Sequence, residues 1–113
     1  MHLSDMTTPE ILDGALELPL VLFYKHSSRC WSSYVAHRHV LELAESHPDL
    51  PIFKIDVIKD RPLSQSVAAK LGIRHESPQV ILIRNGQPVW DTSHYGVTKE
   101  DIENQLSAIA PKS

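Results

Sequence analysis

The chain contains a single cysteine, Cys30, which lies in a polar segment between two apolar stretches. Three residues with basic side chains precede it: Lys25, His26 and Arg29. Cationic neighbours favour the thiolate form of a cysteine, and the thiolate is the form that attacks a disulfide sulfur. With no second cysteine, the chain cannot form an internal disulfide. These residue types predict thiol-disulfide exchange that is centred on one sulfur atom.

Ser33 stands three positions after Cys30, where a dithiol enzyme of the C-x-x-C type would have its second cysteine. Its hydroxyl, one helical turn from Cys30, could donate a hydrogen bond to the thiolate. A C-x-x-S site can form a mixed disulfide but cannot release its substrate by internal attack, so a second thiol must come from outside. The alternative is that Cys30 is an inert, buried residue, which is common for free cysteines. Its position in a polar segment argues against that.

Lys25, His26 and Arg29 are candidates for substrate binding, and three further residues join them. Trp31 directly follows Cys30, and it either provides a flat contact surface for a ligand or packs on a neighbouring loop. Ser77 and Pro78 immediately precede an apolar stretch, and a cis proline there would offer the backbone of Ser77 to a substrate chain. The seven histidines do not predict a metal site, because His37 and His39 point in different directions on a helix.

The elements that position Cys30 alternate between helices and strands. The first helix is expected after the N-cap Thr8, and a strand buried on both faces is expected over 20–24. A polar loop over 25–29 then leads into a helix from about Cys30 to Ser46. The remaining expected elements are a strand at 52–58, a helix from Pro62 to Gly72, a hairpin turning at Asn85-Gly86, and a helix from Thr98 to before Pro111.

This order predicts an α/β fold of the thioredoxin-like class, with a central mixed sheet of about four strands flanked by helices. We expect one domain over residues 1–113, in which 110–113 form a flexible tail. Charged residues make up 22% of the chain and the net charge is -3, which is ordinary for a soluble protein and favours neither nucleic acid nor membrane partners. The first residues lack a signal peptide pattern, so a cytoplasmic location is expected.

The segment LFYKHSSRCWSS (22–33), together with Ser77-Pro78 before Val80 and the Asn85-Gly86 turn, resembles the YtxJ-type monothiol bacilliredoxins. The resemblance spans nearly the whole chain. It implies that Cys30 is the nucleophile, that Ser33 replaces a resolving cysteine, and that Pro78 is a cis proline. Members of that family commonly have proline directly after the cysteine, and Trp31 departs from that pattern.

The resemblance also implies a reaction. Such proteins reduce mixed disulfides between proteins and bacillithiol, a glucosaminyl-malate-cysteine thiol, so that bacillithiol is the cosubstrate and no cofactor is bound. Lys25 and Arg29 would attract the malate carboxylates. The expected partners are S-thiolated client proteins and the small thiol, and the expected state is a monomer or weak dimer. Two alternatives stay open: a non-catalytic binding module or thiol sensor, and an iron-sulfur carrier like the monothiol glutaredoxins.

Overall fold

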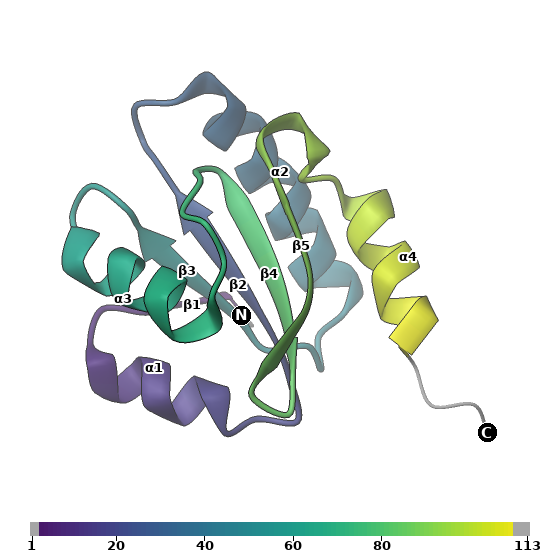
Figure 1. Ribbon diagram of the computed structural model, residues 1–113. Coiled ribbons are helices and arrows are strands. Elements are labelled where there is room, and N and C mark those ends of the chain that lie inside the picture. Colours follow the sequence, from purple (N-terminus) through teal and green to yellow (C-terminus); the bar gives the residue numbers. More distant parts are fainter. Residues whose placement is uncertain (1–2, 110–113) are drawn as a thin grey trace.

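The computed structural model describes residues 3–109, which form a five-stranded sheet with helices on both faces (Figure 1). The strands are β1 (Leu3–Asp5), β2 (Leu20–His26), β3 (Ile52–Asp56), β4 (Gln79–Arg84) and β5 (Gln87–Ser93). The helices are α1 (Pro9–Leu16), α2 (Trp31–Ser46), α3 (Arg61–Leu71), the short 3-10 helix η1 (His94–Gly96) and α4 (Lys99–Ile109). The expected tail at 110–113 lies outside the described residues.

The sheet has the strand order β1-β3-β2-β4-β5. The central strand β2 runs parallel to β3 and antiparallel to β4, and β4 and β5 form the hairpin. The predicted mixed sheet is therefore confirmed, with one strand more than expected. The added strand is β1, which pairs in parallel with β3 at the edge of the sheet. Its three residues are too few to show a strand pattern in the sequence.

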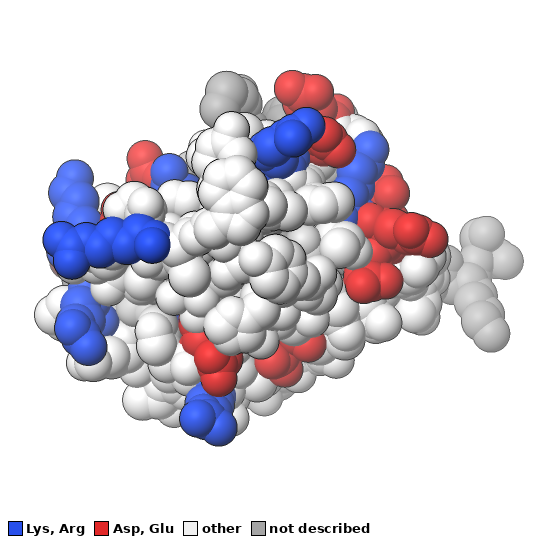
Figure 2. All heavy atoms as spheres, turned by 90° about the horizontal axis from the view of Figure 1, so that it is seen from above, with Lys and Arg blue, Asp and Glu red and all other residues white. Residues whose placement is uncertain are grey.

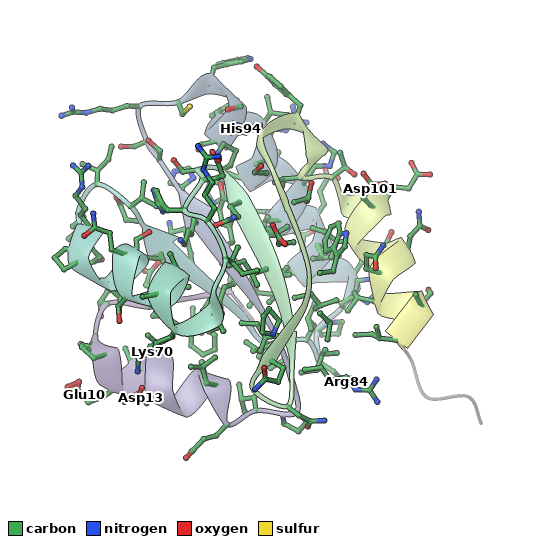
Figure 3. All side chains as sticks on the ribbon, viewed as in Figure 1. Glu10, Asp13, Lys70, Arg84, His94 and Asp101 are labelled. Atoms are coloured by element: carbon green, nitrogen blue, oxygen red, sulfur yellow. The ribbon has the colours of Figure 1, made fainter. Side chains whose placement is uncertain are left out.

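Two apolar cores separate the sheet from the helices. Leu22 and Tyr24 of β2 face one core, which α2 and α4 cover, whereas Val21 and Phe23 face the other, which α1 and α3 cover. All four side chains are buried, which confirms that this strand has apolar neighbours on both faces. On the second face, the Lys70–Asp13 ion pair, 2.8 Å long, also joins α3 to α1 (Figure 3). Two helices therefore pack on each face of β2.

The predicted helix and turn signals are found where expected. Thr8 Oγ1 accepts a hydrogen bond from the Ile11 amide at the start of α1, and Thr98 Oγ1 accepts one from the Asp101 amide at the start of α4. Gly72 ends α3 with a positive φ of 66°, and the hairpin turn at Asn85 has a positive φ of 51°. Both conformations suit the residue types present.

Two boundaries differ from the predictions. Strand β2 continues through Lys25 and His26, which were expected in a loop, because Lys25 pairs with Gln79 and His26 with Asp56. Strand β3 ends at Asp56, two residues before the predicted end at residue 58. The Asp56 carboxylate accepts hydrogen bonds from the amides of Ile58 and Lys59, and these bonds turn the chain. The carboxyl ends of β2 and β3 therefore lie together beside the segment that carries Cys30. No helix within residues 3–109 is long and apolar enough to cross a membrane.

Candidate active site

Cys30 is the N-cap residue of α2 and follows the short loop that leaves β2. It has extended backbone angles, and its carbonyl accepts hydrogen bonds from the amides of Ser33, at 3.1 Å, and Tyr34, at 3.3 Å. Cys30 is partly exposed, and its side chain forms no capping hydrogen bond to the helix backbone. This partly exposed cysteine therefore lies at the positive end of the helix dipole, where an anion is stabilised.

Two serines of the first turn of α2 have different roles. Ser32 Oγ lies 3.5 Å from Cys30 Sγ, so its hydroxyl is the one within hydrogen-bonding reach of the sulfur. Ser33 is fully buried, and its Oγ accepts the Ser27 amide at 3.1 Å. Ser33 thus ties the loop before Cys30 to the helix. The hydroxyl expected at the sulfur from residue spacing comes from Ser32 instead.

A buried tyrosine contacts this turn, and two histidines lie against the tyrosine. The Tyr24 hydroxyl donates to the Ser33 carbonyl at 3.1 Å and lies 2.7 Å from His26 Nδ1. The His37 ring stacks on Tyr24 and lies 5.0 Å from the His26 ring, centroid to centroid. Burial raises the pKa of Tyr24 well above its ordinary value. It lowers the pKa of His26, with His37 and Lys54 adding to the effect.

Lys25 lies on the face of β2 opposite to Tyr24 and is fully buried. Its Nζ is 3.1 Å from Nδ1 of His75, an exposed residue of the loop before Pro78. Nδ1 of His75 also lies 3.2 Å from Ser64 Oγ of α3. Burial lowers the pKa of Lys25 to about 8. Its charge is therefore not presented at the surface, and of the two cations expected to attract carboxylates only Arg29 is exposed.

The Ser77–Pro78 peptide bond is cis, as the sequence resemblance implies. Pro78 is buried, and its carbonyl accepts the His94 amide at 2.8 Å, which links it to η1. Gln79, the next residue, pairs with Lys25 near the end of β2. The antiparallel pairing places Ser77 and Pro78 at the end of the sheet where β2 leads into the loop of Cys30.

Aromatic side chains of α2 and η1 are exposed at the surface. Trp31 is 69% exposed and stacks on Tyr34 of the same helix, with ring centroids 5.2 Å apart and planes 20° apart. Tyr95 of η1, an element in contact with α2, is 66% exposed. In the view from above, uncharged side chains fill the centre of this end, basic residues gather at the left margin, and acidic and basic residues alternate along the right and lower margins (Figure 2).

The structure brings together most of the residues that the sequence singled out. Cys30, Trp31 and Ser33 share the first turn of α2, and Ser77 and Pro78 lie at the same end of the sheet. Sequence reasoning missed Ser32 and Tyr24. The signal for Tyr24 was its place in the buried strand directly before Lys25, since a buried hydroxyl needs a hydrogen-bond partner. Within residues 3–109, no group of three potential ligands could hold a metal ion.

Comparison with solved structures shows the thioredoxin fold. A candidate oxidoreductase with a thioredoxin fold matches with a TM-score of 0.85 and 24% identity, over 91% of this chain and 92% of that chain. A mutant thioredoxin from Halobacterium salinarum NRC-1 matches with a TM-score of 0.80 and 18% identity, over 99% and 94%. A poplar thioredoxin h mutant matches with a TM-score of 0.78 and 24% identity, over 96% and 82%.

The family comparison is more specific than the fold. Residues 4–102 match the family model for the monothiol bacilliredoxin BrxC, and this range contains every element from β2 to β5 together with Cys30 and the cis proline. Family and fold together support a role in thiol-disulfide oxidoreduction, the chemistry that a single accessible cysteine can perform. The chain belongs to the monothiol bacilliredoxin BrxC family.

Proposed function

We propose that this protein reduces mixed disulfides between client proteins and bacillithiol, with Cys30 as the nucleophile and free bacillithiol as the external resolving thiol. The observation that carries the proposal is the setting of Cys30. Cys30 is partly exposed at the start of α2, and the position one turn later holds Ser33, whose Oγ accepts a hydrogen bond from the Ser27 amide. The site can therefore accept one thiol adduct and has no internal means of releasing it.

The reaction has two exchange steps. In the first, the Cys30 thiolate attacks the bacillithiol sulfur of the mixed disulfide, a bond forms between those two sulfurs, and the client leaves as its thiolate. In the second, a bacillithiol thiolate attacks the bacillithiol sulfur of the adduct. This step yields bacillithiol disulfide and regenerates the Cys30 thiolate. Each step breaks one disulfide and forms another, so no further oxidant or reductant is needed.

Neighbouring groups support both steps. The Ser32 hydroxyl lies 3.5 Å from the sulfur and can donate to the thiolate that begins and ends the cycle. Arg29 is exposed in the same loop, and its charge can attract an anionic bacillithiol as it approaches Cys30, before the malate is bound. Because Lys25 is buried, we assign it no direct contact with the substrate.

The decisive experiment incubates the protein with a bacillithiolated model protein, and measures the released client and the mass of Cys30 over time. We expect client release together with a bacillithiol adduct on Cys30, and loss of that adduct when free bacillithiol is added. Cys30→Ala should release no client. The proposal is wrong if the wild type releases no client, or if Cys30→Ala releases it equally well.

Ser33→Cys is a matched variant that restores the missing second thiol. It should form a disulfide with Cys30 after the first step, so that bacillithiol is released without an added external thiol. Quantifying free thiols after one turnover would detect this change, because both cysteines would be lost from the count. An adduct on Cys30 that is as long-lived in Ser33→Cys as in the wild type would contradict the assigned role of position 33.

A further inference from the structure

The stacked pair of Trp31 and Tyr34 forms one wall of a small groove along α2, which begins at the residue after Cys30. The groove has a volume of about 260 Å³, and its other lining residues are Val35, Arg38, His39 and Glu42. Both rings are more than half exposed. An exposed aromatic ring offers a ligand a large, flat apolar contact area.

The polar groups of the groove lie one and two turns further along α2. Arg38 and Glu42 are exposed, and neither takes part in an ion pair within residues 3–109. His39 Nδ1 accepts the Lys99 amide at 3.1 Å, so the neutral ring carries its proton on Nε2 and offers a donor. The groove therefore combines an aromatic wall with a cation, a carboxylate and an imidazole donor.

From this arrangement we propose that the groove binds the amino-sugar and dicarboxylate part of the small thiol, which sets the selectivity of Cys30 for that thiol. The inference rests on the proposed function and names the recognition surface for its cosubstrate. A sugar ring has an apolar C–H face that can lie on an indole, and its hydroxyls can bind Glu42 and His39. The dicarboxylate matches the Arg38 guanidinium.

The residues of the groove follow Cys30 along the same helix, in an order that matches the parts of the small thiol. Arg38 is eight residues after Cys30, which corresponds to about 12 Å along the helix axis, with Trp31 and Tyr34 between them. The order along α2 is thus sulfur, aromatic pair, polar groups. The thiol has the same order of parts, which are cysteine, sugar and malate.

An apolar segment of a client protein would fit this groove less well. It could cover the two rings, but it would also remove the charges of Arg38 and Glu42 from water without pairing them, which is costly. A polyhydroxylated dicarboxylate satisfies the same groups. The composition of the groove therefore favours the small thiol over an apolar peptide.

The test compares two small disulfides that react at the same sulfur. Bacillithiol disulfide carries the sugar and malate, whereas cystine carries the reacting cysteine without either. The second-order rate of adduct formation on Cys30 is measured by mass for each disulfide. We expect Trp31→Ala and Arg38→Ala each to slow the reaction with bacillithiol disulfide about threefold to tenfold, and to leave the reaction with cystine within about twofold.

Two control variants lie outside the groove. Tyr95→Ala removes an exposed aromatic ring at the same end, and Arg84→Ala removes an exposed arginine at the opposite end of the sheet (Figure 3). Neither should change the ratio of the two rates. Circular dichroism of every variant would verify that the fold is intact.

The outcomes separate this inference from the proposed function. If Trp31→Ala and Arg38→Ala slow adduct formation with both disulfides equally, or with neither of them, the groove does not recognise the sugar and malate. If they slow only the reaction with a bacillithiolated client protein, the groove is a client surface and the inference is wrong. If wild-type Cys30 forms no adduct with either disulfide, the proposed function itself fails.

Discussion

Replacing Lys25 with methionine should stabilise the protein at neutral pH, because the wild-type chain must bury an ammonium group. The pKa of Lys25 falls from its ordinary 10.5 to about 8, and burial is the cause. At roughly 1.4 kcal/mol for each pH unit between those values, the buried charge costs about 3 kcal/mol below pH 8. Methionine has a similar length and no charge, so it removes this cost and loses only the contact with His75.

The sign of the pH dependence follows from the two pKa values. Below about pH 8 both the folded and unfolded states carry the charged lysine, and the full cost is present. Between about pH 8 and 10.5 the folded state has lost the proton while the unfolded state retains it, so the wild type gains stability as the pH rises. The contact with His75 offsets about 1 kcal/mol of the gain in Lys25→Met. We therefore expect Lys25→Met to be about 2 kcal/mol more stable at pH 7, and this advantage to vanish by about pH 10.

Urea unfolding followed by circular dichroism at pH 7 and at pH 9.5 measures both quantities. Comparing variant with wild type at each pH cancels the contribution of other groups that titrate in alkali, such as Tyr24. Lys70→Met is the matched control, since Lys70 is exposed and pairs with Asp13 on the surface, and its effect should stay within about 1 kcal/mol at both pH values. A Lys25→Met protein that is less stable at pH 7, or whose advantage is equal at both pH values, would refute the reasoning.

Three smaller predictions concern single contacts. Ser32→Ala should slow alkylation of Cys30 at neutral pH about threefold to tenfold, because the hydroxyl 3.5 Å from the sulfur is lost; an unchanged iodoacetamide rate would contradict this. Tyr24→Phe should lower the free energy of unfolding by about 1–2 kcal/mol, because the Ser33 carbonyl and His26 lose a hydrogen-bonding partner; urea unfolding measures it, and an effect near zero would be inconsistent. Gly72→Ala should cost about 1 kcal/mol, because its φ of 66° strains a residue with a Cβ even though the space there is open; a stabilised variant would show that the turn relaxes.

Most of the fold could be predicted because its signals are local. The apolar run at 20–24 and the Asn85-Gly86 turn specify a buried strand and a hairpin through backbone preferences that need no tertiary context. Strand β1 could not be found in this way. Its three residues hold their place only because β3 offers an open edge, and that is a property of the assembled sheet.

The candidate site was predictable in position but not in side-chain contacts. The polar loop and the following helix located Cys30 at a strand-to-helix junction, which the structure confirms. Spacing alone put the Ser33 hydroxyl at the sulfur, but spacing cannot tell which side chain turns inward, and Ser33 turns toward the Ser27 amide. Likewise, the charge of Lys25 indicated a loop residue. Its burial depends on cross-strand pairing with Gln79 and on His75, 50 residues away.

The serine at position 33, whose Oγ accepts a hydrogen bond from the Ser27 amide, has a kinetic consequence for the proposed cycle. With no thiol one turn away, the Cys30 adduct decays only by collision with free thiol, so its lifetime is inversely proportional to the thiol concentration. In the steady state, the fraction of protein in the adduct form then follows the ratio of S-thiolated clients to free thiol. Such a protein would accumulate in its adduct form when the thiol pool is depleted, and return to the free form as the pool recovers.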